Sequence, residues 1–308
     1  MRIKILIPIS GILFLLLFSG GLGYYSQRSY KHAWDMGHVL AFSVWTYLLI
    51  LLWEDFRRWP FWKQSLWVLV LTLSLGILIE FIQVRFHRAP EAGDVMRDLI
   101  GSLITLSFFS PSRKVISKFS LRLVQTCVVV MLLFGTYPLA RALTDEYTAK
   151  NQFPLLSDFE TPFEIDRWGE NSGLAIDHNI AIHGESSLKV PLSTELYSGV
   201  SFLYFPRDWR NVHSLKFAVF NPSVDSLTIG CRINDIRHFE NGGEYKDRYN
   251  ANFLLRQGWN PITIPIGDIA NAPIGRKMDM SKIQMVRVYV KQLTNPGEIY
   301  IDHVRLEQ

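Results

Sequence analysis

The amino-acid sequence predicts two parts of different fold class, a membrane all-α bundle of about five transmembrane helices followed by an all-β jelly-roll sandwich. Hydrophobic residues make up 48% of the 308-residue chain and charged residues 19%, which is too apolar for one ordinary soluble domain. Long apolar runs fill the first 150 residues, whereas the remainder alternates apolar and other residues with period two. The charge differs as well, because residues 1–150 hold 16 Lys+Arg and 9 Asp+Glu (net +7) and residues 151–308 hold 16 and 19 (net −3).

The apolar runs are the predicted membrane helices, since about 20 residues at a rise of about 1.5 Å cross the hydrocarbon core of a bilayer. They lie at residues 5–23, 39–53, 65–84, 99–109 and 123–140. The fourth is short, so it would need the polar stretch from Glu91 onward, or shelter between neighbouring helices, to span. The first also has the form of a signal peptide, with Arg2 and Lys4 before it. We expect an uncleaved anchor, and cleavage would leave the location of the C-terminal half unchanged.

The distribution of Lys and Arg predicts the orientation of the five helices. Basic residues concentrate on the cytoplasmic side of membrane proteins. If all five runs span, one side carries Arg2, Lys4, Arg57, Arg58, Lys63, Arg113, Lys114, Lys118 and Arg122. The opposite side carries fewer, so we expect a multi-pass protein of the cell (inner) membrane whose C-terminal domain is periplasmic or extracellular.

The second half is predicted to be a two-sheet jelly roll. Segments such as SSLKVPL, SLKFAVF and MVRVYV alternate apolar and other residues, and turn signals such as Asn221-Pro222 and Asn295-Pro296-Gly297 separate them. Eight to ten short strands with no helical period favour a sandwich over other all-β folds. We therefore predict a helical domain at 1–143, a linker at 144–156 and a β-sandwich at 157–308.

Composition also excludes several classes of protein. Cys127 and Cys231 are the only cysteines, so no disulfide framework is predicted. The pI near 9 comes from basic residues that flank the membrane runs, so no nucleic-acid partner is implied. A cytosolic enzyme, a disordered protein and a disulfide scaffold are all excluded.

Polar residues within the membrane half form the first candidate site. An ionisable side chain at the centre of a membrane helix costs about 2.5 to 3.5 kcal/mol, so each one needs a reason. Helical spacing of three or four places pairs of them on common faces, and all fall in the outer leaflet under the predicted topology. We predict one outward-facing polar cup made of Asp35, His38, Glu80, Gln83, Arg88, Asp94, Asp98 and Gly101.

The chemistry of the polar cup would fit a phosphate or pyrophosphate headgroup. An arginine offers a bidentate fork, a histidine can transfer protons, and carboxylates either hold a divalent cation or act as acid and base. Each residue also has a simpler interpretation. Glu80 could pair with Arg85 or Arg88 at the interface, His38 could cap a helix, and Asp94 could stabilise a helix N-terminus.

The segments WDMGHVLAF and GILIEFIQVRFHRAPEAGDVMRDLIGSLI resemble the VanZ-like membrane family, which is linked to glycopeptide resistance. The resemblance covers about residues 5–140. It implies functional roles for His38, Glu80, Gln83, Arg88, Asp94 and Gly101. This chain departs from the family pattern at Asp35, which stands three residues before the histidine instead of four, and at Asp98, where an asparagine is usual.

The second half resembles the carbohydrate-binding-module and galactose-binding-like jelly rolls, on the segments SDFE, HGESSLKV, GVSFLYFPRDW, NDIRHFENGGEYKDRYN and YIDHVRLE. Such folds often hold a structural Ca²⁺ between an opening acidic residue and an aspartate of the last strand. The resemblance implies Glu160 and Asp302 as Ca²⁺ ligands, with Asp158 in reserve. The alternative is that these carboxylates accept hydrogen bonds from backbone amides at the sheet edge.

A sugar-binding face requires aromatic rings beside planar donors and acceptors, because rings stack on sugar C–H faces while hydroxyls need hydrogen bonds. The candidates are Tyr197, Trp209, Arg232, Asp235, Tyr245, Asp247, Arg248 and Asn250. Of these, Trp209 is more often a core residue in such a context.

Three functions compete. The first is an envelope protein whose polar cup binds a lipid-linked or glycan headgroup and whose sandwich binds polysaccharide. The second is an enzyme acting on prenyl-linked phosphate or glycan, with Glu80 or Asp94 as base and Arg88 holding phosphate. The third is a component of polysaccharide export. No nucleophile motif, Walker loop or HExxH occurs in the sequence, which favours binding over catalysis.

Overall fold

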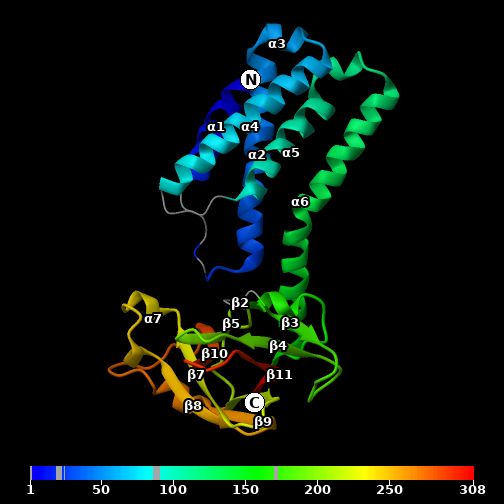
Figure 1. The fold of residues 1–308 in the computed structure, drawn as a ribbon. Helices are drawn as coiled ribbons and strands as arrows, with labels where there is room; N and C mark the ends of the chain where they lie inside the picture. The colour runs from blue at the N-terminus through cyan, green and yellow to red at the C-terminus, as the bar shows by residue number, and fades with distance from the viewer. Residues whose placement is uncertain (1, 19–22, 24, 86–90, 170–172) are drawn as a thin grey trace. The chain divides into compact units, whose positions relative to one another are not determined.

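The computed structural model describes the chain apart from residues 1, 19–22, 24, 86–90 and 170–172. The chain divides into two compact units, Met1–Ala142 and Leu143–Gln308. Figure 1 shows helices in the first unit and strands in the second. An α-helical part followed by two antiparallel sheets was predicted, and this level of the prediction is confirmed.

Among the residues that the structure describes, the helical unit has five long helices and two short ones. Their bounds are α1 (Arg2–Phe18), α2 (Arg28–Leu52), α3 (Glu54–Arg58), α4 (Phe61–Arg85), α5 (Ala92–Phe109), η1 (Pro111–Lys114) and α6 (Lys118–Gln152). Within the described residues, three helices are long and apolar enough to cross a membrane, in α2, α4 and α6. α1 is a shorter apolar helix, and the 18 residues of α5 include Asp94, Arg97 and Asp98. The topology with five spans therefore stays a prediction.

Small and hydroxyl-bearing residues hold α5 against α2 and α4. A Cβ atom built on Gly101 would fall inside the contact distance of the Val39 carbonyl oxygen and 3.1 Å from the Ser43 amide nitrogen, so only glycine permits this approach of α5 to α2. Ser43 Oγ donates to the Gly101 carbonyl at 2.9 Å, and Thr105 Oγ1 donates to the Ser43 carbonyl at 2.9 Å.

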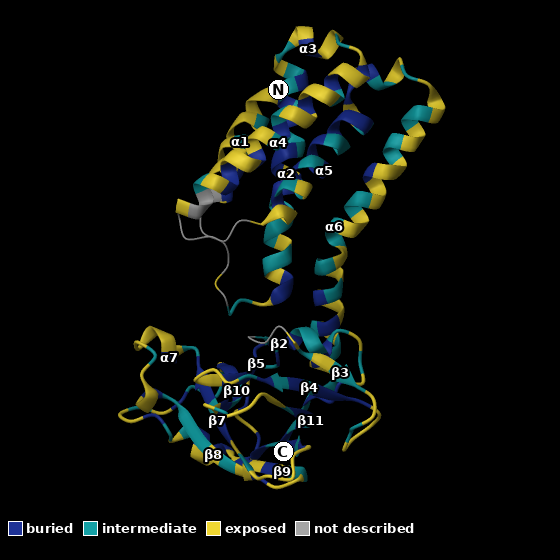
Figure 2. Cartoon of the chain, viewed as in Figure 1, coloured by how far each residue is buried: buried dark blue, intermediate teal, exposed yellow. Residues whose placement is uncertain are grey.

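Figure 2 shows long exposed stretches on α1 and α4, and many of the residues exposed there are large and hydrophobic. On α4, Leu66 is 63% exposed, Ile77 62% and Phe81 66%. Such an apolar surface is what a lipid environment requires, because the hydrocarbon core offers no water or hydrogen-bond partners to polar side chains.

The second unit is a sandwich of two antiparallel sheets. One sheet has the order β3-β4-β11-β6-β9, with β1 paired to β11, and the other has the order β2-β5-β10-β7-β8. The strands are β1 (Leu155–Ser157), β2 (Trp168–Gly169), β3 (Ala175–Asp177), β4 (Ser187–Leu192), β5 (Tyr197–Phe202), β6 (Ser214–Asn221), β7 (Leu227–Asp235), β8 (Tyr249–Leu255), β9 (Gly258–Pro265), β10 (Ile283–Lys291) and β11 (Gly297–Glu307). Short helical turns connect them, namely η2 (Glu164–Arg167), α7 (Arg237–Glu240), η3 (Tyr245–Asp247) and α8 (Ile266–Ala270).

Alternation along the strands builds one core between the sheets. Val286, Val288 and Val290 of β10 point inward, while Arg287 and Tyr289 between them do not belong to the core. Trp209 is fully buried in this core, and its Nε1 donates to the Pro206 carbonyl at 2.9 Å. Trp209 is therefore a core residue, which corrects its place among the candidate ligand residues.

The segment predicted as a linker, residues 144–156, is the end of α6 followed by β1. Asp145 on α6 accepts from Arg167 Nε at 2.9 Å, and both side chains are buried. Arg167 also donates to the Leu156 carbonyl at 2.7 Å. The predicted linker is therefore mostly helical, and a buried ion pair holds the end of α6 to Arg167.

Candidate functional site

A buried polar cluster lies where α2 meets α5. His38 Nδ1 lies 2.8 Å from Asp98 Oδ1, and His38 Nε2 lies 3.4 Å from Asp94 Oδ2. All three side chains are nearly inaccessible. Arg97 extends the cluster, since its guanidinium lies 2.5 Å from Asp94 and 3.8 Å from Asp35. Arg97 supplies positive charge beside Asp94, and His38 lies between the two carboxylates as a hydrogen-bonding partner. Buried carboxylates require such partners, because an unpaired charge is costly to bury.

The other predicted members of the polar cup are placed differently. Glu80 is 8% exposed and its Oε2 accepts from the Glu91 amide at 3.0 Å. Its Oε1 is buried with no hydrogen-bond partner among the residues that the structure describes. Gly101 serves the close approach of two helix backbones. Arg88 and the side chain of Gln83 lie outside the described residues.

Sequence reasoning missed Arg97 as a member of this cluster. The sequence does contain a signal for it, because Arg97 follows Asp94 by three residues and two residues at that spacing share one face of a helix. The cluster links α2 to α5, and its role as a ligand-binding cup stays a prediction.

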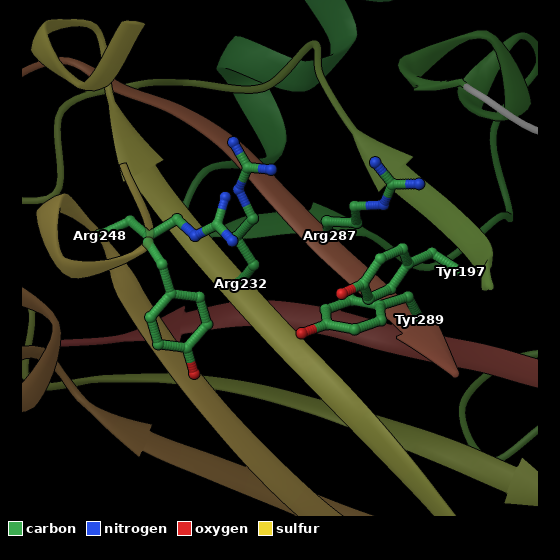
Figure 3. Close-up of a pocket in the computed structure, with 6 residues that line it drawn as sticks. Tyr197, Arg232, Arg248, Arg287 and Tyr289 are labelled. Carbon is green, nitrogen blue, oxygen red and sulfur yellow. The ribbon is translucent and has the colours of Figure 1, made fainter. Parts of the chain in front are cut away.

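In the second unit, a pocket of about 230 Å³ lies on the face of the sheet opposite the core (Figure 3). The described residues that line it are three arginines and three tyrosines, Tyr197, Arg232, Tyr245, Arg248, Arg287 and Tyr289. Four of the eight predicted ligand residues therefore meet in one place. Arg287 and Tyr289, which the sequence analysis did not select, complete it.

Glycines on both neighbouring strands make room for Tyr289. The register pairs Tyr289 of β10 with Gly199 of β5 and with Gly230 of β7. A Cβ on Gly230 would lie 2.5 Å from the Tyr289 ring, and one on Gly199 would lie 2.5 Å from its Cα. The ring of Tyr289 thus lies directly over the Gly230 backbone, and Tyr197 meets it edge-on with 5.7 Å between ring centroids. These rings offer a preformed aromatic surface to a ligand.

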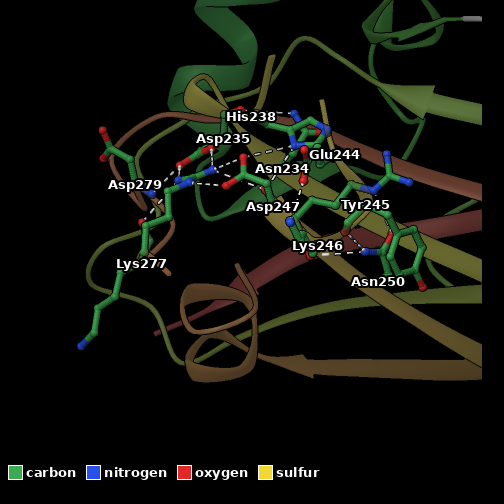
Figure 4. Close-up of polar contacts among 12 residues, drawn as sticks. Asn234, Asp235, His238, Glu244, Tyr245, Lys246, Asp247, Asn250, Lys277 and Asp279 are labelled. Carbon is green, nitrogen blue, oxygen red and sulfur yellow. Dashed lines mark hydrogen bonds and ion pairs between the residues drawn. The ribbon is translucent and has the colours of Figure 1, made fainter. Parts of the chain in front are cut away.

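Three other predicted ligand residues, Asp235, Asp247 and Asn250, contact the segments that form the rim of this pocket. Asp235 and Asp247, both labelled in Figure 4, do not line it, because Arg276 binds both of them. Arg276 donates to Asp235 at 2.6 and 2.9 Å and to Asp247 at 2.6 and 2.8 Å. These bonds lower the pKa of Asp247 and hold η3, which carries Tyr245. Asn250 accepts from Arg248 Nε at 3.0 Å and donates to the Tyr245 carbonyl at 3.0 Å.

Glu160 and Asp302, the predicted Ca²⁺ ligands, and Asp158, held in reserve, all contact the loop at residues 182–186. Asp302 accepts from the amides of Ile182 and His183 at 2.8 and 3.0 Å. Glu160 accepts from the amides of Glu185 and Ser186 at 2.7 and 2.8 Å. Asp158 Oδ2 lies 3.5 Å from the His183 ring. Asp302 and Glu160 thus accept hydrogen bonds from backbone amides, as the alternative to metal binding expects. Binding of Ca²⁺ stays a prediction.

His303 lies beside this loop, and its lowered pKa leads us to expect that acid destabilises the sandwich. Its ring stacks on His183 with 4.0 Å between centroids, and burial, then the charges of Arg305 and His183, lower its pKa to about 4. As the pH falls below about 6.5, the unfolded imidazole takes up a proton while the folded one does not until about pH 4, so unfolding is increasingly favoured across that window. Asparagine tolerates the positive φ of 53° at this position. We expect the difference in melting temperature between His303→Asn and the wild type to be several degrees more favourable to the variant at pH 4.5 than at pH 7.

Melting of the full chain in detergent at both pH values tests this expectation. His213→Asn is the control, because His213 is exposed. Parallel pH dependence of the wild type and His303→Asn would contradict the role of His303.

No family model matches the chain, and no curated protein does. The resemblance to the VanZ-like family and to glycopeptide resistance therefore has no support from these comparisons. The C-terminal half is structurally similar to carbohydrate-binding β-sandwiches.

Three solved structures illustrate this similarity. A family 11 carbohydrate-binding module from Clostridium thermocellum, in complex with a β-1,3-1,4-mixed-linked tetrasaccharide, shares 17% identity, with 50% of this chain and 94% of that one covered and a TM-score of 0.37. An exo-β-agarase shares 17% identity over 50% of this chain, at a TM-score of 0.40, and the match spans 24% of the agarase. A family 22 module and its xylanase from Clostridium thermocellum, complexed with xylohexaose, shares 13% identity over 50% of this chain and 28% of that one, at a TM-score of 0.34. Likeness at this level carries no conclusion about the ligand of this chain.

Proposed function

We propose that this chain is a multi-pass cell-envelope membrane protein whose outer β-sandwich binds polysaccharide. Three long apolar helices support the membrane assignment. The Tyr/Arg pocket supports the binding assignment, and the single observation that carries it is the Tyr289 ring laid over Gly230 on the face opposite the core. Sugar rings present C–H faces that stack on such a surface, while guanidinium groups beside it donate to hydroxyl oxygens.

For the helical unit we propose that the buried cluster around His38 belongs to an outward-facing cup for a lipid-linked or glycan headgroup. The cluster places carboxylates and a guanidinium group among apolar helices, where charged side chains are costly and often functional, and this supports the proposal. A second candidate function is an enzyme acting on prenyl-linked phosphate or glycan. The observation that favours it is the buried Oε1 of Glu80, which has no hydrogen-bond partner among the described residues.

Removal of the Tyr289 ring tests the binding function. We expect Tyr289→Ala to weaken polysaccharide binding by the full chain about tenfold or more, because the stacking surface is lost, and Tyr289→Phe to retain most of it. The measurement is equilibrium binding of the detergent-purified protein to mixed-linked β-glucan, xylan, agarose and polygalacturonate.

Tyr147→Ala is the matched control, since Tyr147 is 70% exposed on α6 and lies outside the pocket. Binding that survives Tyr289→Ala unchanged, or a wild-type protein that binds none of these polysaccharides, would remove the proposed function of the sandwich.

A further inference from the structure

The Tyr/Arg pocket concentrates positive charge in a part of the chain that is otherwise negative. Residues 151–308 carry a net charge of −3, yet three guanidinium groups line this one pocket. They come from different strands, with Arg232 on β7, Arg287 on β10 and Arg248 immediately before β8. Figure 3 shows the side chains of Arg232 and Arg287 extending in the same direction from the sheet.

The register makes this concentration of charge costly. Arg287 lies directly opposite Arg232 in the antiparallel pairing of β10 with β7. Like charges at such positions destabilise a sheet, and partial burial raises the cost because solvent screens the two charges less. Burial, with the charge of Arg287 among the further causes, lowers the pKa of Arg248. An anion in the pocket would offset the repulsion of Arg287 with both Arg232 and Arg248.

Two of the guanidinium groups are held in place before a ligand arrives. Arg248 donates through Nε to Asn250 Oδ1 and lies over the Tyr245 ring, 5.2 Å from its centroid. Arg232 lies 5.7 Å from the centroid of the Phe239 ring. A fixed, planar guanidinium matches a carboxylate or a sulfate through two parallel hydrogen bonds, and fixing it in advance reduces the entropy lost on binding.

We propose that the ligand of this pocket is an acidic polysaccharide, whose carboxylate or sulfate groups bind the arginines while its sugar rings stack on Tyr289 and Tyr197. This inference rests on the proposed function of the sandwich and specifies its ligand. The volume of about 230 Å³ is smaller than that of a pocket for a drug-sized molecule and fits one charged sugar unit of a longer chain.

Matched pairs of polysaccharides that differ in charge test the inference. The pairs are polygalacturonate and its methyl ester, alginate and its propylene glycol ester, and dextran sulfate and dextran, each titrated onto the full chain in detergent. We expect at least one acidic member to bind about tenfold or more tightly than its neutral partner and to lose affinity as the ionic strength rises. The pair that responds distinguishes a carboxylate ligand from a sulfate ligand.

Arg287→Gln should lower the affinity for that acidic polysaccharide by about tenfold or more, because a hydrogen bond to a charged group is lost. Arg256→Gln is the control, since it removes the same charge from an exposed position outside the pocket. Equal or tighter binding of the neutral member in every pair, or loss of affinity to the same extent in Arg256→Gln, would overturn the acidic ligand and leave polysaccharide binding standing. A folded protein that binds no member of any pair, nor the neutral glucan and xylan, would overturn both.

Discussion

Gly101→Ala is expected to prevent stable folding of the helical unit. The new methyl group would overlap the Val39 carbonyl oxygen and crowd the Ser43 amide, and both belong to the backbone of α2, so no flexible side chain can yield. The helices would have to separate. Overpacking of a core typically costs about 1 to 3 kcal/mol, and more where backbones collide.

Separation of α2 from α5 would also break the polar contacts that cross the same interface. The hydrogen bonds of Ser43 and Thr105 and the pair of His38 with Asp98 all reach α5 within about one turn of Gly101. A histidine and an aspartate pulled apart inside a helix bundle would each be left as a buried polar group without compensation. The loss of stability is therefore expected to exceed that of an ordinary packing mutation.

The yield of monodisperse protein after detergent extraction, and its melting temperature, measure this effect. Gly37→Ala is the matched control, because a Cβ at Gly37 on α2 would meet no heavy atom within 4 Å and alanine favours the helix. Wild-type yield and melting temperature for Gly101→Ala would show that α2 and α5 do not pack as described.

The helices and strands could be predicted because their signals are local. Apolar runs and alternation with period two depend only on near neighbours in the sequence, so both units were recognised. The same alternation in the segment MVRVYV already placed Arg287 and Tyr289 on one face of a strand. It did not reveal that this strand lies between β5 and β7, which brings Tyr197 and Tyr289, 92 positions apart in the sequence, into one pocket.

The roles of single residues depended on contacts that sequence spacing does not contain. His38 and Asp98 were each selected, but their pairing spans 60 residues of chain. Asp235 and Asp247 were selected as ligand residues because they are polar and near aromatic residues. The structure makes them partners of Arg276, which the sequence analysis never considered. The resemblance implied a functional role for Gly101, whereas its lack of a side chain is what the packing of α2 against α5 requires.

Arg276→Met is expected to give the largest loss of stability in the sandwich. Asp235 is fully buried and Asp247 nearly so, and Arg276 makes two hydrogen bonds to each. Methionine keeps much of the side-chain volume but leaves two buried carboxylates facing one another. Breaking a buried ion pair in this way costs about 3 to 5 kcal/mol, which corresponds to a fall in melting temperature of roughly 10 °C for a domain of this size.

The same change should weaken polysaccharide binding. The bonds of Arg276 to Asp235 and Asp247, here called the Arg276 clamp, hold η3 and so fix Tyr245 and the adjacent Arg248 at the edge of the pocket. Arg210→Met is the matched control, since Arg210 pairs with Asp208 on the surface with both side chains more than half exposed, where an ion pair contributes about 0 to 1 kcal/mol. Arg276→Lys should recover only part of the loss, because one ammonium group cannot form two forked contacts.

Equal melting temperatures for Arg276→Met and Arg210→Met would contradict the clamp. A less stable Arg276→Met with unchanged affinity, measured at a temperature where it is folded, would instead show that the clamp stabilises the sandwich without positioning the pocket.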